Sequence, residues 1–244
     1  MKKLLVIPND PLYRYVEKGE VKERYFNPEN YFDEVHVLSL CQADDALDAA
    51  RLMSGDAARV VIHPVGRPGL LSWRAVKKRA LDLARSINPD AVRSYNPLFM
   101  GCLAVACARA ASAVSVISVH DDYSIARSIG IYGPRFLLTM RGAYQVAQNL
   151  LGLNRYMFGR VDHVICAYRF CLRYVGRWRT GEVSVIYNRV DLKKFYPGPV
   201  EKRSSPAGNG IRILNVGRQF EGKNPEPLIR ALAQMEPPSR LTLV

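Results

Sequence analysis

Short apolar runs alternate with helical stretches along the first 190 residues of the chain. The runs have the length and β-branched content of buried strands, and they predict strands at 3–7, 33–40, 59–63, 91–95, 114–119, 161–167 and 183–187. The segments between them predict helices at 44–53, 70–87, 97–111 and 170–178, and helical or irregular chain from 123 to 159. They also predict a long loop at 11–31 on the rim of the sheet, either without regular structure or with one helical turn. This alternation is typical of a parallel α/β sheet covered on both faces, and right-handed crossovers make such a sheet doubly wound.

The alternation of predicted strands and helices stops between residues 191 and 209. Three prolines lie in this stretch together with Gly, Ser, Lys and Asn, a composition typical of an interdomain linker. A strand at 211–216, a helix at 225–235 and a strand at 240–244 follow. We therefore predict a domain at 1–190, a linker at 191–209, and the first β-α-β unit of a second domain at 210–244. A unit of this size buries too little apolar surface to fold alone, so we expect the second domain to be incomplete; the alternative is that the unit docks on the first sheet.

The net charge of +13 indicates an anionic partner, which could be a nucleic acid, an anionic membrane or a phosphorylated substrate. The apolar run at the start is only five residues long, too short for a signal peptide, and no run approaches the length of a membrane span. The five cysteines lack the Cys-x-x-Cys spacing of zinc or redox sites. These features predict free buried thiols in a reducing compartment, and hence a cytoplasmic protein.

Two cations follow the strand at 211–216. The strand ends at Gly217, and Arg218 and Lys223 come before the next helix. Ligands bind at the carboxyl ends of strands in open α/β sheets, and a helix N-terminus favours anions. The spacing suits a diphosphate. The alternative is an ordinary surface loop with two solvated cations.

His120 directly follows the strand at 114–119 and is the candidate for contact with a substrate. The alternative is a buried histidine that holds the following loop. Asp121 is either a site residue or a helix N-cap. His36 and His63 lie inside strands, where structural roles are favoured. The spacing yields no Ser/His/Asp or Cys/His catalytic set.

Three stretches together resemble the GT-B glycosyltransferases of family 4, a retaining group that uses nucleotide-sugar donors. They are Val116-Ile-Ser-Val-His-Asp-Asp122, Val183-Ser-Val-Ile-Tyr-Asn-Arg-Val-Asp-Leu-Lys-Lys-Phe-Tyr-Pro197 and Leu214-Asn-Val-Gly-Arg-Gln-Phe-Glu-Gly-Lys-Asn224. The first is similar to the family's strand ending in His-Asp, the second to its entry into the linker, and the third to its donor loop. Their order and spacing fit the family over nearly the whole chain.

The resemblance implies two Rossmann-like domains that face each other across a cleft, with the acceptor on the first and the nucleotide-sugar on the second. It implies that Gly217, Arg218 and Lys223 bind the donor diphosphate and that His120 is the catalytic-site histidine. Asp121 and Asn188 are then further contacts in the cleft. The family needs no metal and no cofactor, which agrees with finding adjacent acidic pairs, such as Asp44-Asp45 at the start of a predicted helix, in place of Asp-x-Asp.

The chain departs from the family at three places. The family's C-terminal acidic pair would lie beyond Val244, Arg189 stands where the family has glycine, and no glycine-rich loop follows the first strand. The resemblance implies a retaining transfer of sugar to a glycan or lipid-linked acceptor, in surface polysaccharide or glycolipid assembly. We expect this chain to be inactive, because most of the donor site is absent from it.

The basic charge is concentrated in one part of the sequence. Nine arginines lie between Tyr123 and Gly181 against one acid, Asp162, and apolar residues interleave with them. The helix at 70–87 adds Trp73 and four further cations in its first half. This pattern predicts peripheral contact with an anionic membrane at the inner face of the plasma membrane, and the alternative is a set of solvated helix faces. Two other functions stay open: a sugar-nucleotide epimerase of the same fold, and a basic nucleic-acid-binding module, although no nucleic-acid recognition motif is evident.

Overall fold

The computed structural model describes residues 1–69, 71–179, 181–188, 190, 192, 196, 211–217, 225–235 and 239–243, without the side chains of residues 140 and 141. The chain divides into two compact units. One comprises residues 1–127 and 137–188, and the other comprises residues 128–136 and 189–244. Of the predicted linker, only residues 192 and 196 are described, so the predicted domain boundaries stay predictions.

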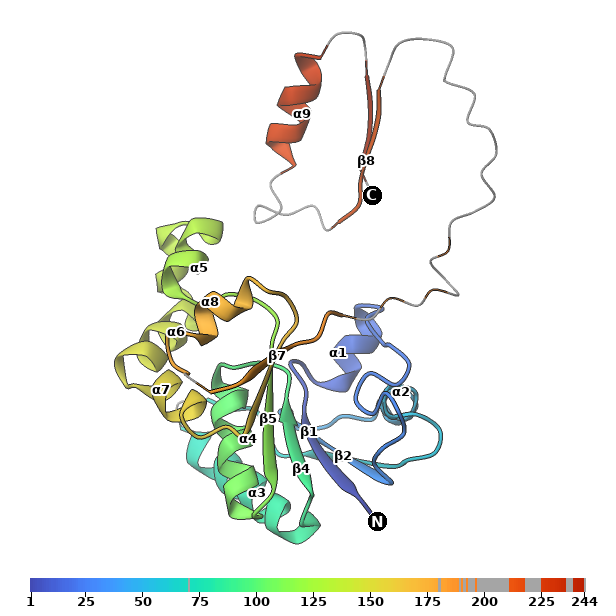
Figure 1. Ribbon diagram of the computed structural model, residues 1–244, viewed down its shortest axis with the longest axis vertical. Coiled ribbons are helices and arrows are strands. Elements are labelled where there is room, and N and C mark those ends of the chain that lie inside the picture. Colours follow the sequence, from blue (N-terminus) through green and yellow to red (C-terminus); the bar gives the residue numbers. More distant parts are fainter. Residues whose placement is uncertain are drawn as a thin grey trace. The chain divides into compact units, whose positions relative to one another are not determined.

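The first unit contains a seven-stranded parallel sheet (Figure 1). Its strands are β1 (Lys3–Ile7), β2 (Glu34–Ser39), β3 (Arg59–Pro64), β4 (Ala91–Ser94), β5 (Val114–Val119), β6 (His163–Cys166) and β7 (Val183–Val185). The order is β3-β2-β1-β4-β5-β6-β7. Strands β2 and β3 are added on one side of β1. Strand β4 then pairs with the other side of β1, and β5, β6 and β7 follow in that direction. The predicted doubly wound parallel sheet is confirmed.

Helices cover both faces of this sheet, because alternate side chains of each strand point to opposite sides. The helices of this unit are α1 (Leu12–Glu17), α2 (Leu47–Ser54), α3 (Trp73–Ile87), α4 (Phe99–Ala110), α6 (Met140–Leu150), α7 (Leu153–Phe158) and α8 (Cys171–Val175). Helix α5 (Ile125–Tyr132) and the 3-10 helix η1 (Pro134–Leu138) each contain residues of both units. Leu4 and Val6 of β1 share a buried cluster with residues of α1 and α2. Leu5 and Ile7 share another with residues of α3 and α4.

A third buried cluster joins β5 and β6 to α4, α7 and α8. Ile117 and Val164 come from the strands, and Phe158 and Tyr174 come from α7 and α8. Gly101 of α4 lies close to α7, since a Cβ there would meet Met157 Sδ at 2.5 Å and the backbone oxygen of Asn96 at 3.1 Å. The helices on this side therefore pack too tightly for a side chain at residue 101.

The second unit contains the predicted β-α-β pattern. Its elements are β8 (Arg212–Asn215), α9 (Glu226–Ala233) and β9 (Arg240–Leu243), and the two strands pair in parallel. Gly217 follows β8 and is described. Arg218 and Lys223 lie outside the described residues, so their place at a donor diphosphate stays a prediction.

The prediction that Asp44 starts a helix is wrong. Helix α2 begins at Leu47, and the carboxylate of Asp44 serves α1 instead. It accepts hydrogen bonds from Leu12 N at 2.7 Å, Tyr13 N at 3.3 Å and Ser39 Oγ at 2.5 Å. The aspartate therefore satisfies the first N–H groups of a helix more than 30 residues earlier and ties that helix to the end of β2.

Substituting Asp44 with alanine should lower the free energy of unfolding by about 1–3 kcal/mol, because a hydroxyl and three backbone donors, those of Leu12, Tyr13 and Ala46, lose their acceptor. Asp45→Ala is the matched control, because the carboxylate of Asp45 is exposed and makes none of these hydrogen bonds. Urea denaturation of both variants measures the difference. Equal stabilities for the two variants would contradict this role of Asp44.

Candidate functional site

A hollow of about 280 Å³ opens at the carboxyl edge of the sheet, where the order of the strands reverses between β1 and β4. Ligands bind at such switch points in open α/β sheets. The lining comes from the chain after β1, β4 and β5 and from the segment between β1 and β2: Asn9, Tyr15, Glu20, Lys22, Tyr25, Tyr95, His120 and Tyr123.

Stacked aromatic side chains build the wall between the β1–β2 connection and β4. The rings of Tyr25 and Tyr95 stack with centroids 4.7 Å apart, and Phe26 lies 5.6 Å from Tyr95. The hydroxyl of Tyr95 donates a hydrogen bond to the backbone oxygen of Tyr25 at 3.0 Å. A loop that the sequence places only on the rim is thus held against the central strands.

His120 lies where the strand pattern predicts, directly after β5 and in the lining of the hollow. Its ring is partly buried and stacks on Tyr95 with centroids 6.3 Å apart. Its Nε2 atom is buried and has no hydrogen-bond partner within the described structure. Burial lowers the pKa of His120, and the positive charges of Arg93 and Lys22 lower it further. A neutral imidazole therefore faces the hollow at neutral pH.

The other two predicted cleft residues do not line the hollow. Asp121 accepts a hydrogen bond from Asp122 N at 2.8 Å, and its carboxylate lies 3.9 Å from Arg127 Nε. Asn188 donates from Nδ2 to the hydroxyl of Tyr168 at 2.9 Å. Both contacts are local, and a role for either residue in substrate binding stays a prediction.

Arg93 is not among the lining residues but packs against one of them, Tyr95, and sequence reasoning missed it. It is the third residue of β4, and its guanidinium lies 4.5 Å from the ring centroid of Tyr95. The hydroxyl oxygen of Ser118 on β5 accepts from Nε at 3.3 Å and from Nη2 at 3.1 Å. The signal that could have found it is a single cation in the middle of a short buried strand next to the switch point.

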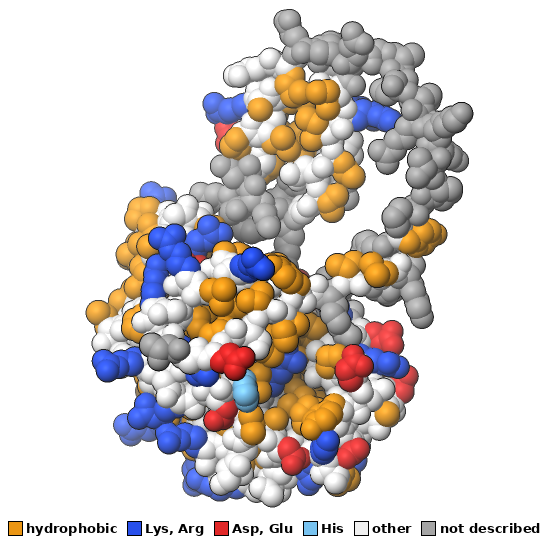
Figure 2. Space-filling model, in the orientation of Figure 1, with side chains coloured by type: hydrophobic (Ala, Val, Ile, Leu, Met, Phe, Trp, Pro, Cys, Tyr) orange, Lys and Arg blue, Asp and Glu red, His pale blue; other side chains and the backbone are white. Residues whose placement is uncertain are grey.

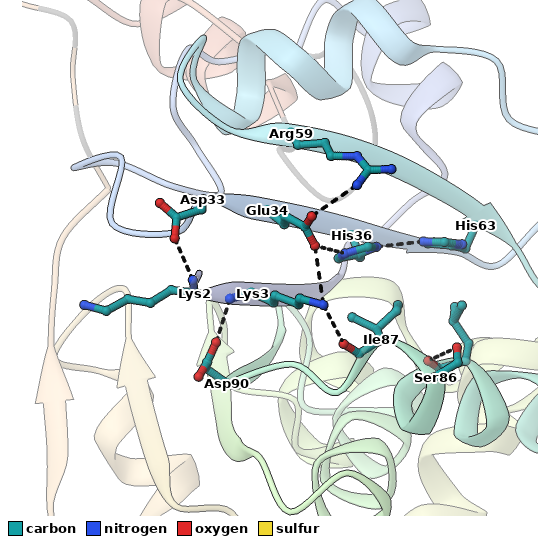
Figure 3. Close-up of polar contacts among 11 residues, drawn as sticks. Lys2, Lys3, Asp33, Glu34, His36, Arg59, His63, Ser86, Ile87 and Asp90 are labelled. Atoms are coloured by element: carbon teal, nitrogen blue, oxygen red, sulfur yellow. Dashed lines mark hydrogen bonds and ion pairs between the residues drawn. The ribbon is translucent and has the colours of Figure 1, made fainter.

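His36 and His63 belong to a different cluster, near the β3 edge of the sheet (Figure 3). His36 Nδ1 lies 3.0 Å from His63 Nε2, and His36 Nε2 lies 3.3 Å from Glu34 Oε2. The buried Glu34 carboxylate also pairs with Lys3 Nζ at 3.7 Å and Arg59 Nη1 at 3.3 Å. This network joins the first residues of three neighbouring strands, which is a structural role.

Reactive sulfur and metal ligands are not features of the described site. All five cysteines are free thiols, and burial raises the pKa of Cys102 to about 11 and that of Cys107 to about 12. Across the residues that the structure describes, no three His, Cys, Asp or Glu side chains form a group that could hold a metal ion. None of the described helices is long and apolar enough to cross a membrane.

The sequence profile of Glycosyltransferase Family 4 matches residues 33–194, two thirds of the chain. The chain belongs to glycosyltransferase family 4. The resemblance carried by the three sequence stretches is thereby confirmed, and the strand that ends in His120 lies inside the matched region.

Solved structures agree with the family at the level of the fold. HepE of Anabaena, in complex with UDP and glucose, is 18% identical with a TM-score of 0.60, and its complex with UDP-glucose gives 16% and 0.60. Both matches cover all of this chain and 60% of HepE, so the chain spans about three fifths of that protein's length. A putative UDP-N-acetylglucosamine 2-epimerase of Listeria monocytogenes is 12% identical, with a TM-score of 0.49 over all of this chain and 62% of the epimerase. Among curated proteins, no sequence matches this chain.

Substituting Arg93 with glutamine should raise the pKa of His120 toward its usual 6.5, because one of the two charges that oppose its protonation is removed. In the unsubstituted protein the unfolded chain takes up a proton near pH 6.5 before the folded one does. Stability contributed by the neutral ring is therefore present above pH 6.5 and is lost as the pH falls from there through the folded pKa.

Titration of the imidazole signals by NMR measures this shift. Arg85→Gln is the control, because Arg85 is exposed on α3 and pairs with Asp82 at 2.9 Å, away from the hollow. A pKa of His120 that stays the same in Arg93→Gln would show that the two groups do not interact.

Proposed function

We propose that the protein that carries this chain transfers a sugar from a nucleotide-sugar to an acceptor bound in the hollow beside His120, with retention of configuration at the anomeric carbon. The observation that carries the proposal is the neutral, partly buried His120 in a hollow at the switch point of a family 4 chain. HepE was solved with UDP and with UDP-glucose, which makes UDP-sugars the first donors to test.

The proposed chemistry needs a stable leaving group. The bond between the donor sugar and its diphosphate breaks, and negative charge grows on the nucleoside diphosphate in the transition state. Cations at Arg218 and Lys223, after Gly217, would stabilise that charge more than they stabilise the bound donor. His120 would place a neutral ring nitrogen near the transferred sugar or the acceptor hydroxyl. No metal or cofactor enters this proposal.

The acceptor is proposed to be a glycan or a lipid-linked saccharide in surface polysaccharide or glycolipid assembly. Charge supports a position beside an anionic membrane, at the cytoplasmic face of the plasma membrane. Between residues 57 and 188 there are 18 Lys and Arg against 6 Asp and Glu, whereas residues 1–56 hold 7 against 11. Figure 2 shows Lys and Arg gathered on the side of α3, α6 and α7, and many of the acids on the side of α1 and α2.

Exposed leucines accompany these cations. Leu71 precedes α3, and Leu150 and Leu151 end α6, with exposed fractions of 97%, 80% and 71%. The aromatic contacts Trp73–Phe99 and Phe99–Tyr144 link α3 and α6 through the start of α4. Cations beside exposed apolar side chains are what a peripheral membrane surface needs.

In the protein that carries this chain, substituting His120 with alanine should lower acceptor-dependent release of nucleoside diphosphate from a UDP-sugar by roughly 100-fold, the size of effect expected for a positioned polar group in the transition state. His163→Ala is the matched control, because that histidine is exposed on β6. Conversion of the nucleotide-sugar without any acceptor would instead favour the epimerase. Measuring the 244-residue chain in the same assay tests the expectation that it is inactive by itself.

Replacing both Leu150 and Leu151 with serine should weaken binding to vesicles that contain phosphatidylglycerol by about tenfold, because two exposed apolar anchors are lost. Binding of the unsubstituted protein should fall as the salt concentration rises from about 50 to 500 mM. Leu52→Ser is the control, an exposed leucine of α2 on the acidic side. Co-sedimentation measures both effects, and binding that ignores salt and lipid charge would overturn the membrane proposal.

A further inference from the structure

Arg93 is a partly buried cation on β4. It lies on β4 between Ala91 and Tyr95, which both pack toward α1 and α2, so its side chain leaves the sheet on that face. Its hydrogen bonds go to one neutral acceptor, the hydroxyl oxygen of Ser118. Within the described part of the chain, no carboxylate lies within ion-pair distance of it.

Fully buried charges in proteins are normally paired, and Arg93 is partly buried. Lys3 and Arg59, the first residues of β1 and β3, share the carboxylate of Glu34, whereas no ion pair of this kind is formed by Arg93 within the described residues. A hydroxyl oxygen and an aromatic face contact the guanidinium of Arg93 but carry no net charge. The guanidinium also keeps donors that Ser118 does not use, in the fork arrangement that suits a phosphate or a carboxylate.

A second cation and an unused polar atom lie around the same spot. Lys22 lines the hollow, with its ammonium 5.8 Å from the ring centroid of Tyr25. The buried Nε2 of His120 has no partner in the described structure. Burial lowers the pKa of His120, and the positive charges of Arg93 and Lys22 lower it further. Glu20 also lines the hollow.

The size of the hollow limits what can enter it. At about 280 Å³ it lies just below the range of roughly 300–1,000 Å³ for ligand pockets. Such a volume suits a group of the size of one monosaccharide. The polar lining, with tyrosine hydroxyls, an amide and a carboxylate, suits a sugar that has hydroxyl groups on several sides.

We infer that the acceptor presents a negatively charged sugar to this hollow, with its phosphate or carboxylate group bound by Arg93 and Lys22. The identification of the ligand as the acceptor rests on the proposed function. The anion-binding site itself does not depend on that function. The inference assigns Arg93 as a specificity-determining residue: it holds the charged group while the rest of the sugar lies against the residues that line the hollow.

The test is calorimetric titration of the 244-residue chain with three probes at constant ionic strength and without nucleotide: glucose 1-phosphate, glucuronate and glucose. The chain should bind at least one charged probe about tenfold or more tightly than glucose, the size of effect of one charge-assisted bidentate contact. A preference for glucose 1-phosphate identifies a phosphate site, and a preference for glucuronate identifies a carboxylate site. Glucose binding as tightly as both charged probes would overturn the inference.

Variants assign the preference to a residue. Arg93→Gln should abolish it and Lys22→Gln should reduce it, while Arg93→Lys, which keeps the charge without the fork, should retain part of it. Arg85→Gln should leave it unchanged. Thermal unfolding shows whether each variant is folded, and Arg93→Lys carries the test if Arg93→Gln is not. An unchanged preference in a folded Arg93 variant, or an equal loss in Arg85→Gln, would overturn the assignment.

The position of the probe is a separate readout. The imidazole NMR signals of His120 should shift on addition of the preferred probe, and those of exposed His163 should not. If the preference holds but acceptor-dependent transfer is absent, the anion site stands and the proposed function fails. If transfer occurs with uncharged acceptors and is unaffected by Arg93→Gln, the function stands and the anion site fails.

Discussion

The first unit is organised by the pairing of β1 with two parallel neighbours, β2 on one side and β4 on the other. Because crossovers between parallel strands are right-handed, the connections that leave in opposite directions along the sheet lie on opposite faces. The chain after β1 and the chain after β4 and β5 therefore diverge at the carboxyl edge. The hollow occupies the place where they part, and it needs no special packing defect to exist.

Opposite to the hollow, carboxylates fix the starts of the strands. Asp33 and Asp90 accept hydrogen bonds at 2.6 Å from the backbone N–H groups of Lys2 and Lys3 (Figure 3). Asp162 does the same for Ser115 at the start of β5. Polar groups at the amino edge of the sheet thus fix the register of the strands. The residues at the carboxyl edge are available for ligand binding. The division matches the general rule that a rigid scaffold positions binding residues on the loops at one edge.

β1 was predictable from sequence because it is buried on both faces and its apolar run is uninterrupted, and β5 because its β-branched residues are mostly buried. β1 and β5 occupy the predicted residues. His120 was predictable for the same reason, since its position follows from where a strand ends. Asp44 was assigned wrongly because an aspartate before an apolar run is a helix-start signal, and the partner that it actually binds, Leu12, is distant in sequence.

Arg93, Lys22 and Tyr25 escaped sequence reasoning because contacts distant in sequence decide their roles. The sequence around a single arginine in a strand does not indicate whether a carboxylate lies beside it in the folded chain. The position of Tyr25 depends on a bond from Tyr95, 70 residues later. Local patterns describe the sheet well, whereas the wall of the hollow comes from pairs that only the folded chain brings together.

That wall has a consequence for how the protein can diverge. Lys22 and Tyr25 belong to a connection that contributes no strand to the sheet, whereas Arg93 and His120 belong to or directly follow strands. Substitutions in the connection can alter the shape and charge of the hollow while the register of the strands stays intact. Selectivity for a new ligand can therefore evolve in this one connection at little cost to folding, with the hydroxyl of Tyr95 as the anchor that such changes have to keep.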